Sequence, residues 1–134
     1  MRIRFHAAPL LAGLSLLGAI ALAVDAGADA ADAISNRDAF ALVEAGNSPL
    51  FVDVRTREEY TSGHVPGAVN IPRDQLAGRL AELESARDRL VVYCERGPRA
   101  LAAQATLEGA GFTGVRHLSG DMSGWRAAGL PIEK

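Results

Sequence analysis

Apolar residues are distributed along the chain in two alternating patterns. Largely apolar runs at 50–54 and 90–93 suit strands buried on both faces, and further extended segments lie at 68–71 and 115–118. Segments of helical character lie between them: from Ser35 to Gly46, from Thr56 to Gly63, beyond Pro72, from Pro98 to Gly109 or Gly111, and around Trp125. This alternation predicts an α/β fold, with a parallel sheet covered by helices on both faces.

Capping residues mark the ends of the first helices. Ser35 can accept a hydrogen bond from the first turn of the helix that follows it, and Gly46 can end that helix. Thr56 followed by Glu59 has the spacing of a capping box, which predicts a short helix ending at Gly63. Beyond Pro72, three leucines at i, i+4 and i+7 predict one face of a further helix: Leu76, Leu80 and Leu83.

The first thirty residues have the pattern of an export signal. Arg2 and Arg4 precede a stretch without charge from 7 to 24, and several sites with small residues follow it. We therefore expect a signal peptide over 1–30, cut at about 23–33, and a periplasmic or secreted protein. An uncleaved membrane anchor is the alternative. The Ala, Asp and Gly residues from 25 to 33 predict a loose leader, so the folded domain is expected at 35–134.

Composition narrows the classes of partner. The chain is 49% hydrophobic and 22% charged, which supports one core without disulfides or metal. Its net charge of −2, with both signs interspersed, provides no basic stripe for nucleic acid. Cys94, His64 and His117 lack the spacing of metal ligands. We expect a monomer that acts on small molecules or proteins and needs neither metal nor cofactor.

Chemistry concentrates in the loop that follows the apolar run 90–93. Cys94 is the single cysteine of the chain. The amides of a tight loop before a helix favour an anion and stabilise a thiolate. Gly97 permits a turn that a β-carbon forbids, and Pro98 suits the first helical position. Arg96 and Arg99 add positive charge for an anionic substrate.

Two alternatives compete with a sulfur-carrying cysteine. A lone cysteine ending a core strand can be a small packing residue, although packing does not require the loop that follows it. Cysteine phosphatases have one residue more between cysteine and arginine than Cys94 and Arg99 have here, and the next position is Ala100. The shorter loop suits a single sulfur atom better than a tetrahedral phosphate. The absence of a second cysteine also disfavours arsenate reductase.

Several motifs, taken together and in order, resemble the rhodanese domain from about Ser35 to Lys134. They are Asp53-Val54-Arg55, Glu59-Tyr60, the segment 63–68, Asn70-Ile71-Pro72, the Cys94 loop, Gly111-Phe112, the segment 118–120, Trp125 and the segment 128–131. The resemblance implies a five-stranded parallel sheet flanked by helices and a persulfide on Cys94. It also implies transfer of sulfur from thiosulfate or a related small anionic donor to cyanide or a thiol.

The resemblance further implies that the loop binds the donor through Glu95, Arg96, Gly97, Pro98 and Arg99. A persulfide carrier for a protein partner, with little turnover of free donors, is the alternative function. Two positions depart from the family pattern. Asp121 stands where a second glycine is common and is expected only to alter a turn. Glu95 directly follows the cysteine, and its carboxylate opposes a thiolate unless an arginine neutralises it.

Supporting roles are predicted for three residues outside the loop. Asp53 ends a strand and is expected to orient arginines or loop amides. Arg55 and Glu59, four residues apart, are expected to pair. Arg99 is expected to pair with Asp53 or Glu59, since a cation in the first helical turn needs an acidic partner. His64, between glycine and proline, is interpreted as a structural loop histidine rather than a general base.

Overall fold

The computed structural model describes residues 32–134. The predicted signal peptide over 1–30, most of its expected cleavage range and the alternative membrane anchor lie outside these residues. Within the described range, no helix combines the length and the apolar character that a membrane span requires.

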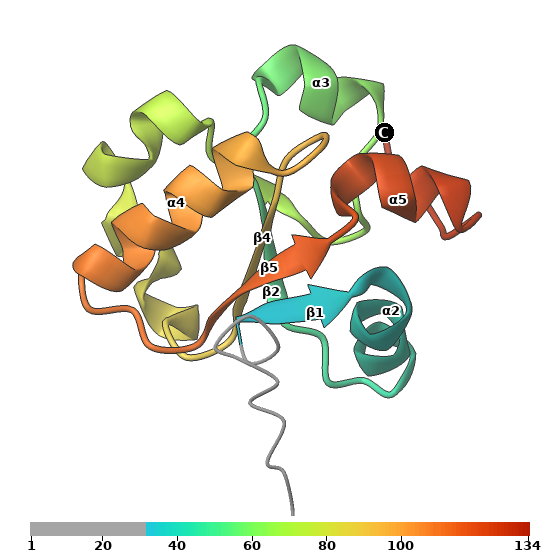
Figure 1. The fold of residues 1–134 in the computed structure, drawn as a ribbon, viewed down its shortest axis with the longest axis horizontal. Coiled ribbons are helices and arrows are strands. Elements are labelled where there is room, and N and C mark those ends of the chain that lie inside the picture. Colours follow the sequence, from blue (N-terminus) through green and yellow to red (C-terminus); the bar gives the residue numbers. More distant parts are fainter. Residues whose placement is uncertain (1–31) are drawn as a thin grey trace, which may run out of the picture.

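Five parallel strands form a single sheet at the centre of the domain (Figure 1). They are β1 (Ala33–Ser35), β2 (Leu50–Asp53), β3 (Val69–Asn70), β4 (Leu90–Tyr93) and β5 (Val115–Ser119), in the order β1-β5-β4-β2-β3. In the centre of the sheet Val92 of β4 lies opposite Val52 of β2 and His117 of β5. The predicted five-stranded parallel sheet is therefore confirmed, with the completely buried β4 in the middle.

Helices cover both faces of the sheet. They are α2 (Asn36–Glu44), α3 (Arg57–Ser62), the 3-10 helices η1 (Arg73–Gly78) and η2 (Leu80–Ala86), α4 (Pro98–Gly109) and α5 (Asp121–Ala127). One buried cluster joins Leu76, Leu83 and Leu107 to one face of the sheet. A second cluster joins Met122 and Trp125 to the other face. Figure 1 shows α4 on one side and α2 and α5 on the opposite side.

The capping signals have the predicted effect. Ser35 Oγ accepts a hydrogen bond of 3.1 Å from the Asp38 amide at the start of α2. Thr56 and Glu59 form the complete capping box: the Glu59 amide donates to Thr56 Oγ1, and the Thr56 amide donates to the Glu59 carboxylate. Local sequence therefore determines where both helices begin.

The helix predicted beyond Pro72 has a different form. Instead of one α-helix, the chain makes η1 and η2, which Arg79 separates with φ −127° and ψ 20°. Leu76 and Leu83 are both buried, while Leu80 is only partly buried. The apolar spacing thus identified the leucines that face the core. Two short 3-10 helices, rather than one α-helix, bury Leu76 and Leu83 there.

Strand β1 occupies part of the segment predicted to be a loose leader. It pairs with β5 at the edge of the sheet, with Ala33 opposite His117 and Ser35 opposite Ser119. Ile34 is its one buried residue. The prediction of a loose leader was wrong for Ala33, because a run of three residues with one large apolar side chain, Ile34, carries no strand signal. Pairing with a distant strand creates the element.

Candidate active site

The loop from Cys94 to Arg99 connects β4 to α4 and folds around the cysteine sulfur. The Gly97 amide donates a hydrogen bond of 3.0 Å to Cys94 Sγ, and the Cys94 residue is only 1% exposed. Gly97 has φ +124°, a conformation that side chains with a β-carbon rarely adopt. Pro98 then opens α4, and the Leu101 amide closes its first turn on the Gly97 carbonyl. The loop therefore brings an amide and a helix N-terminus to the sulfur.

The Glu95 carboxylate contacts two arginines. Its Oε1 accepts a hydrogen bond from Arg126 of α5, and its Oε2 lies 3.5 Å from Nη1 of the buried Arg55. Glu95 was expected to oppose a thiolate unless an arginine neutralised its charge. Two arginines contact its carboxylate, so this condition is met. Arg126 was missed from sequence because only the packing of α5 places it beside the loop.

Arg99 pairs with Glu59 across the mouth of the loop. Its two terminal nitrogens lie 2.7 and 3.0 Å from the two carboxylate oxygens, a bidentate arrangement. The Arg99 guanidinium lowers the pKa of Glu59 from its ordinary value of 4.5 to about 2. Of the two partners expected for Arg99, Glu59 is the one observed. The predicted pairing of Arg55 with Glu59 is wrong, because Arg55 turns into the core toward Asp53.

The Glu59 pKa predicts how the stability contributed by this pair depends on pH. Because the pKa is lower in the folded state, the pair stabilises the fold above pH 4.5, and this contribution is lost as the pH falls toward about 2. Wild type should therefore exceed Glu59→Gln in melting temperature at neutral pH, and the gap should close between pH 4.5 and 2. Thermal denaturation of both proteins across that pH range measures the difference in melting temperature. A difference that persists unchanged at pH 2 would contradict the assignment of the low pKa to Glu59.

Asp53 lies completely buried at the end of β2 and orients Arg55. It accepts hydrogen bonds from Nε and Nη2 of Arg55, the latter at 2.7 Å, and from the Tyr93 hydroxyl at 2.9 Å. Arg55 Nη2 also donates to the Gly63 carbonyl at 2.8 Å. Burial and the Asp53 charge raise the pKa of Tyr93, so its hydroxyl stays protonated. Through Arg55, this network reaches Glu95 and thus the loop.

Asp121 makes contacts that the sequence interpretation did not foresee. Its Oδ1 accepts a hydrogen bond of 3.0 Å from the Cys94 backbone amide and lies 3.7 Å from Sγ. His117 Nε2 lies 3.0 Å from both carboxylate oxygens. The expectation that Asp121 only alters a turn is therefore wrong. The signal in the sequence was an acidic residue, Asp121, at a position where glycine is common and four residues after His117. This spacing could have indicated the pair of His117 and Asp121.

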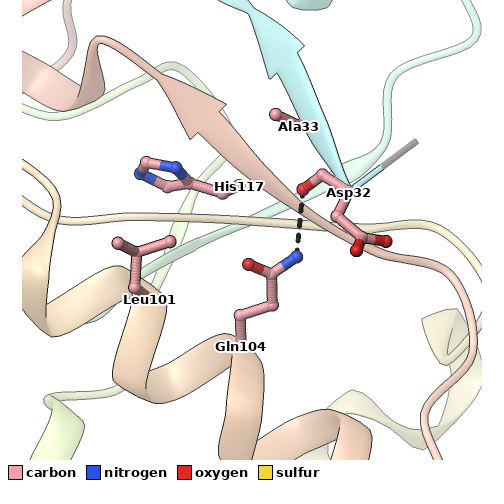
Figure 2. Close-up of a pocket in the computed structure, with 5 residues that line it drawn as sticks. All are labelled: Asp32, Ala33, Leu101, Gln104 and His117. Carbon is pink, nitrogen blue, oxygen red and sulfur yellow. Dashed lines mark hydrogen bonds between the residues drawn. The ribbon is translucent and has the colours of Figure 1, made fainter. Parts of the chain in front are cut away.

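Two pockets adjoin the site without including Cys94 in their walls. Figure 2 shows the larger, about 230 Å³, between β1, β5 and α4, lined by Asp32, Ala33, Leu101, Gln104 and His117. Gln104 Nε2 closes one side by donating a hydrogen bond of 3.0 Å to the Asp32 carbonyl. The smaller, about 190 Å³, is lined by Val54, Thr56, Pro72, Arg73, Asp74 and Arg99. The larger pocket shares His117 with the site, and the smaller pocket shares Arg99 with it.

His64 has the contacts of a structural residue. Its Nδ1 lies 2.9 Å from the Tyr60 carbonyl, and its ring stacks on the Tyr60 ring with centroids 3.7 Å apart. Neither contact joins it to Cys94. Within residues 32–134, no group of three or more His, Cys, Asp or Glu side chains is arranged to hold a metal ion.

Comparison with known proteins places this site in a family. The family model described as the rhodanese-like domain matches residues 35–128. A thiosulfate:glutathione sulfurtransferase of Homo sapiens is 36% identical, over 63% of this chain and 84% of that protein. An HTH-type transcriptional regulator of Mycobacterium tuberculosis is 46% identical over 77% of this chain, which spans only 45% of the regulator's length.

A solved structure agrees with these sequence matches. The rhodanese-like domain of an Anabaena protein superposes with a TM-score of 0.69 at 29% identity, covering 76% of this chain and 78% of that one. The range that the family model matches includes strands β2 to β5 and the loop after β4 in which the site lies. This chain therefore belongs to the rhodanese family.

Proposed function

We propose that this chain is a sulfurtransferase that carries a sulfane sulfur on Cys94, taking it from thiosulfate or a related anionic donor and passing it to cyanide or a thiol. The observation that carries the proposal is the hydrogen bond of 3.0 Å from the Gly97 amide to Cys94 Sγ, in a loop that ends at the N-terminus of α4. Such amides stabilise negative charge on sulfur. The sulfurtransferase among the relatives supports the same reaction class.

The proposed reaction has two displacement steps. In the first, the Cys94 thiolate attacks the outer sulfur of thiosulfate; a bond from Sγ to that sulfur forms, the sulfur–sulfur bond of the donor breaks, and sulfite leaves with its electron pair. In the second, cyanide or a thiolate attacks the outer sulfur of the persulfide and restores the Cys94 thiolate. Covalent catalysis of this kind divides one transfer into two easier steps.

The two arginines of the loop have different roles in this proposal. Arg99 is held by Glu59 and contributes positive charge near Cys94. Arg96 is exposed, and in the described part of the chain its side chain forms no hydrogen bond or ion pair. It is therefore available to meet the sulfonate end of thiosulfate.

Substitution of Arg96 by alanine is expected to raise the thiosulfate KM with little change in melting temperature. The size should be that of a charged hydrogen bond, about 1.5–3 kcal/mol, which is roughly tenfold to a hundredfold in KM. Arg99→Ala is the matched control, since it should lower the melting temperature as well as the activity by leaving Glu59 unpaired. Steady-state kinetics and thermal denaturation measure both; the opposite pattern would reverse the two roles.

A persulfide carrier that serves a protein partner is the second candidate. Leu101, in the first turn of α4 beside the loop, is 54% exposed, so one apolar side chain beside Cys94 is accessible to a partner. The similarity to a transcriptional regulator indicates that related segments also occur in proteins that are named as regulators rather than as enzymes. Under this alternative, thiosulfate should still load Cys94 with one sulfur atom, but turnover with cyanide or small thiols should be negligible.

Mass spectrometry after thiosulfate treatment, followed by addition of cyanide, distinguishes the candidates. Gain of one sulfur atom on the protein, and its rapid loss to cyanide, supports the enzyme. Gain of sulfur with slow loss supports the carrier. Absence of any added sulfur contradicts both.

A further inference from the structure

Asp121 connects Cys94 to a histidine that the proposed reaction does not use. The carboxylate is 2% exposed, and its Oδ1 binds the Cys94 amide and lies 3.7 Å from Sγ. His117 Nε2 is 3.0 Å from both carboxylate oxygens. The side chains thus follow one another in the order Cys94, Asp121, His117, with the carboxylate in the middle.

A carboxylate in this position presents an electrostatic problem for a nucleophilic thiol. Negative charge so close to Sγ disfavours the thiolate, and exclusion of water strengthens the repulsion. A protonated His117 in contact with both oxygens cancels the carboxylate charge. In the described part of the chain, His117 is the only basic side chain that contacts Asp121.

Other charged side chains near Cys94, Asp121 and His117 are those of Arg99, Glu95 and Asp32. Arg99 of α4 adds positive charge near Cys94 and is held by Glu59. Glu95 faces Arg55 and Arg126. Asp32, which directly precedes β1, lines the same pocket as His117, and Figure 2 shows the His117 ring at the edge of that pocket. The pocket gives the imidazole access to solvent protons.

We propose that His117 and Asp121 are positioning residues that set the ionisation of Cys94: when the thiol loses its proton, His117 holds one, so the charge of the three groups does not change. The S–H bond of Cys94 releases its proton to solvent, and Nδ1 of His117 takes up a proton through the pocket. Nε2–H remains donated to Asp121. No electrons move between molecules in this step. The inference rests on the proposed role of Cys94 as nucleophile.

The backbone at Asp121 agrees with a specific role for its side chain. Asp121 has φ +53° and is the one non-glycine residue with positive φ in the described range. Glycine is favoured in this conformation. A β-carbon at Gly97 would lie 3.4 Å from Asp121 Oδ2, so the loop passes close to this carboxylate.

Alkylation by iodoacetamide tests the inference because the chain contains a single cysteine. The rate, followed against pH, reports the thiolate fraction without any sulfur donor. His117→Gln leaves Asp121 uncompensated, and the midpoint of the profile should rise by about one pH unit, roughly tenfold in rate on the rising limb. Asp121→Asn removes the carboxylate that His117 compensates, so the midpoint should stay close to that of the wild type.

A double variant and a matched control complete the design. In His117→Gln with Asp121→Asn, the profile should match that of Asp121→Asn alone, because His117 acts only through the carboxylate. His64→Gln, which alters a buried histidine that does not contact Cys94 or Asp121, should leave the profile unchanged. Asp121→Gly replaces Asp121→Asn if the latter does not fold, since glycine adopts φ +53° without strain.

Two results would overturn the inference: a His117→Gln midpoint within experimental error of the wild type, or a double variant whose midpoint stays as high as that of His117→Gln. The failure of the proposed function is a separate result. If no persulfide forms but the alkylation profiles shift as expected, sulfur transfer is wrong and the electrostatic coupling stands. If the persulfide forms and the profiles do not move, the coupling is wrong and sulfur transfer stands.

Discussion

Cys94→Ser is expected to abolish formation of thiocyanate from thiosulfate and cyanide, with a loss of at least about a thousandfold, the scale seen when a nucleophile is removed. A serine hydroxyl stays protonated at neutral pH and cannot hold a persulfide. The chain has no other thiol that could substitute. Colorimetric detection of thiocyanate measures the rate, and retention of even about a tenth of the activity would contradict the assignment of Cys94.

The same variant provides its own structural control. Serine differs from cysteine by one atom, and its hydroxyl can accept the hydrogen bond that the Gly97 amide gives to Sγ. The melting temperature should therefore change little. Mass spectrometry after thiosulfate treatment should show added sulfur on the wild type and none on Cys94→Ser. Added sulfur on the variant would locate the transfer elsewhere.

Asp53→Ala is expected to lower the free energy of unfolding by about 3–5 kcal/mol, because it leaves the guanidinium of Arg55 buried without its carboxylate. Arg55 is 1% exposed and Asp53 is fully buried, and three side-chain hydrogen bonds from Arg55 join them. Such a loss is a large part of the 5–15 kcal/mol, roughly, that stabilises a domain. Urea denaturation with linear extrapolation measures it.

Two further variants identify the cause of this destabilisation. Glu82→Ala breaks the exposed pair with Arg79 and should leave the unfolding free energy close to wild type, since solvent screens that pair. Combining Asp53→Ala with Arg55→Leu removes the unpaired charge and should recover part of the stability. If Asp53→Ala were no more destabilising than Glu82→Ala, the buried pair would not hold this end of the sheet together.

Local interactions explain which features could be predicted from sequence. The buried strands β2 and β4 are apolar runs, and the start of α3 follows from the capping box of Thr56 and Glu59. The loop around Cys94 depends on Gly97 and Pro98, whose backbone preferences are intrinsic. These features involve residues a few positions apart, so the sequence by itself determined them, together with the sheet type and the candidate nucleophile.

Only the tertiary structure decided the features that depend on distant segments. Strand β1 forms because it pairs with β5 at the edge of the sheet. Arg55 pairs with Asp53 and not with Glu59 because its side chain is buried in the core. Asp121 meets Cys94 only because α5 packs beside the end of β4. The partners of β1 and of Asp121 lie far away in the chain, and Arg55 has two acidic neighbours in sequence, Asp53 and Glu59. In each case the free energy of burial selects among pairings that local sequence leaves equally available.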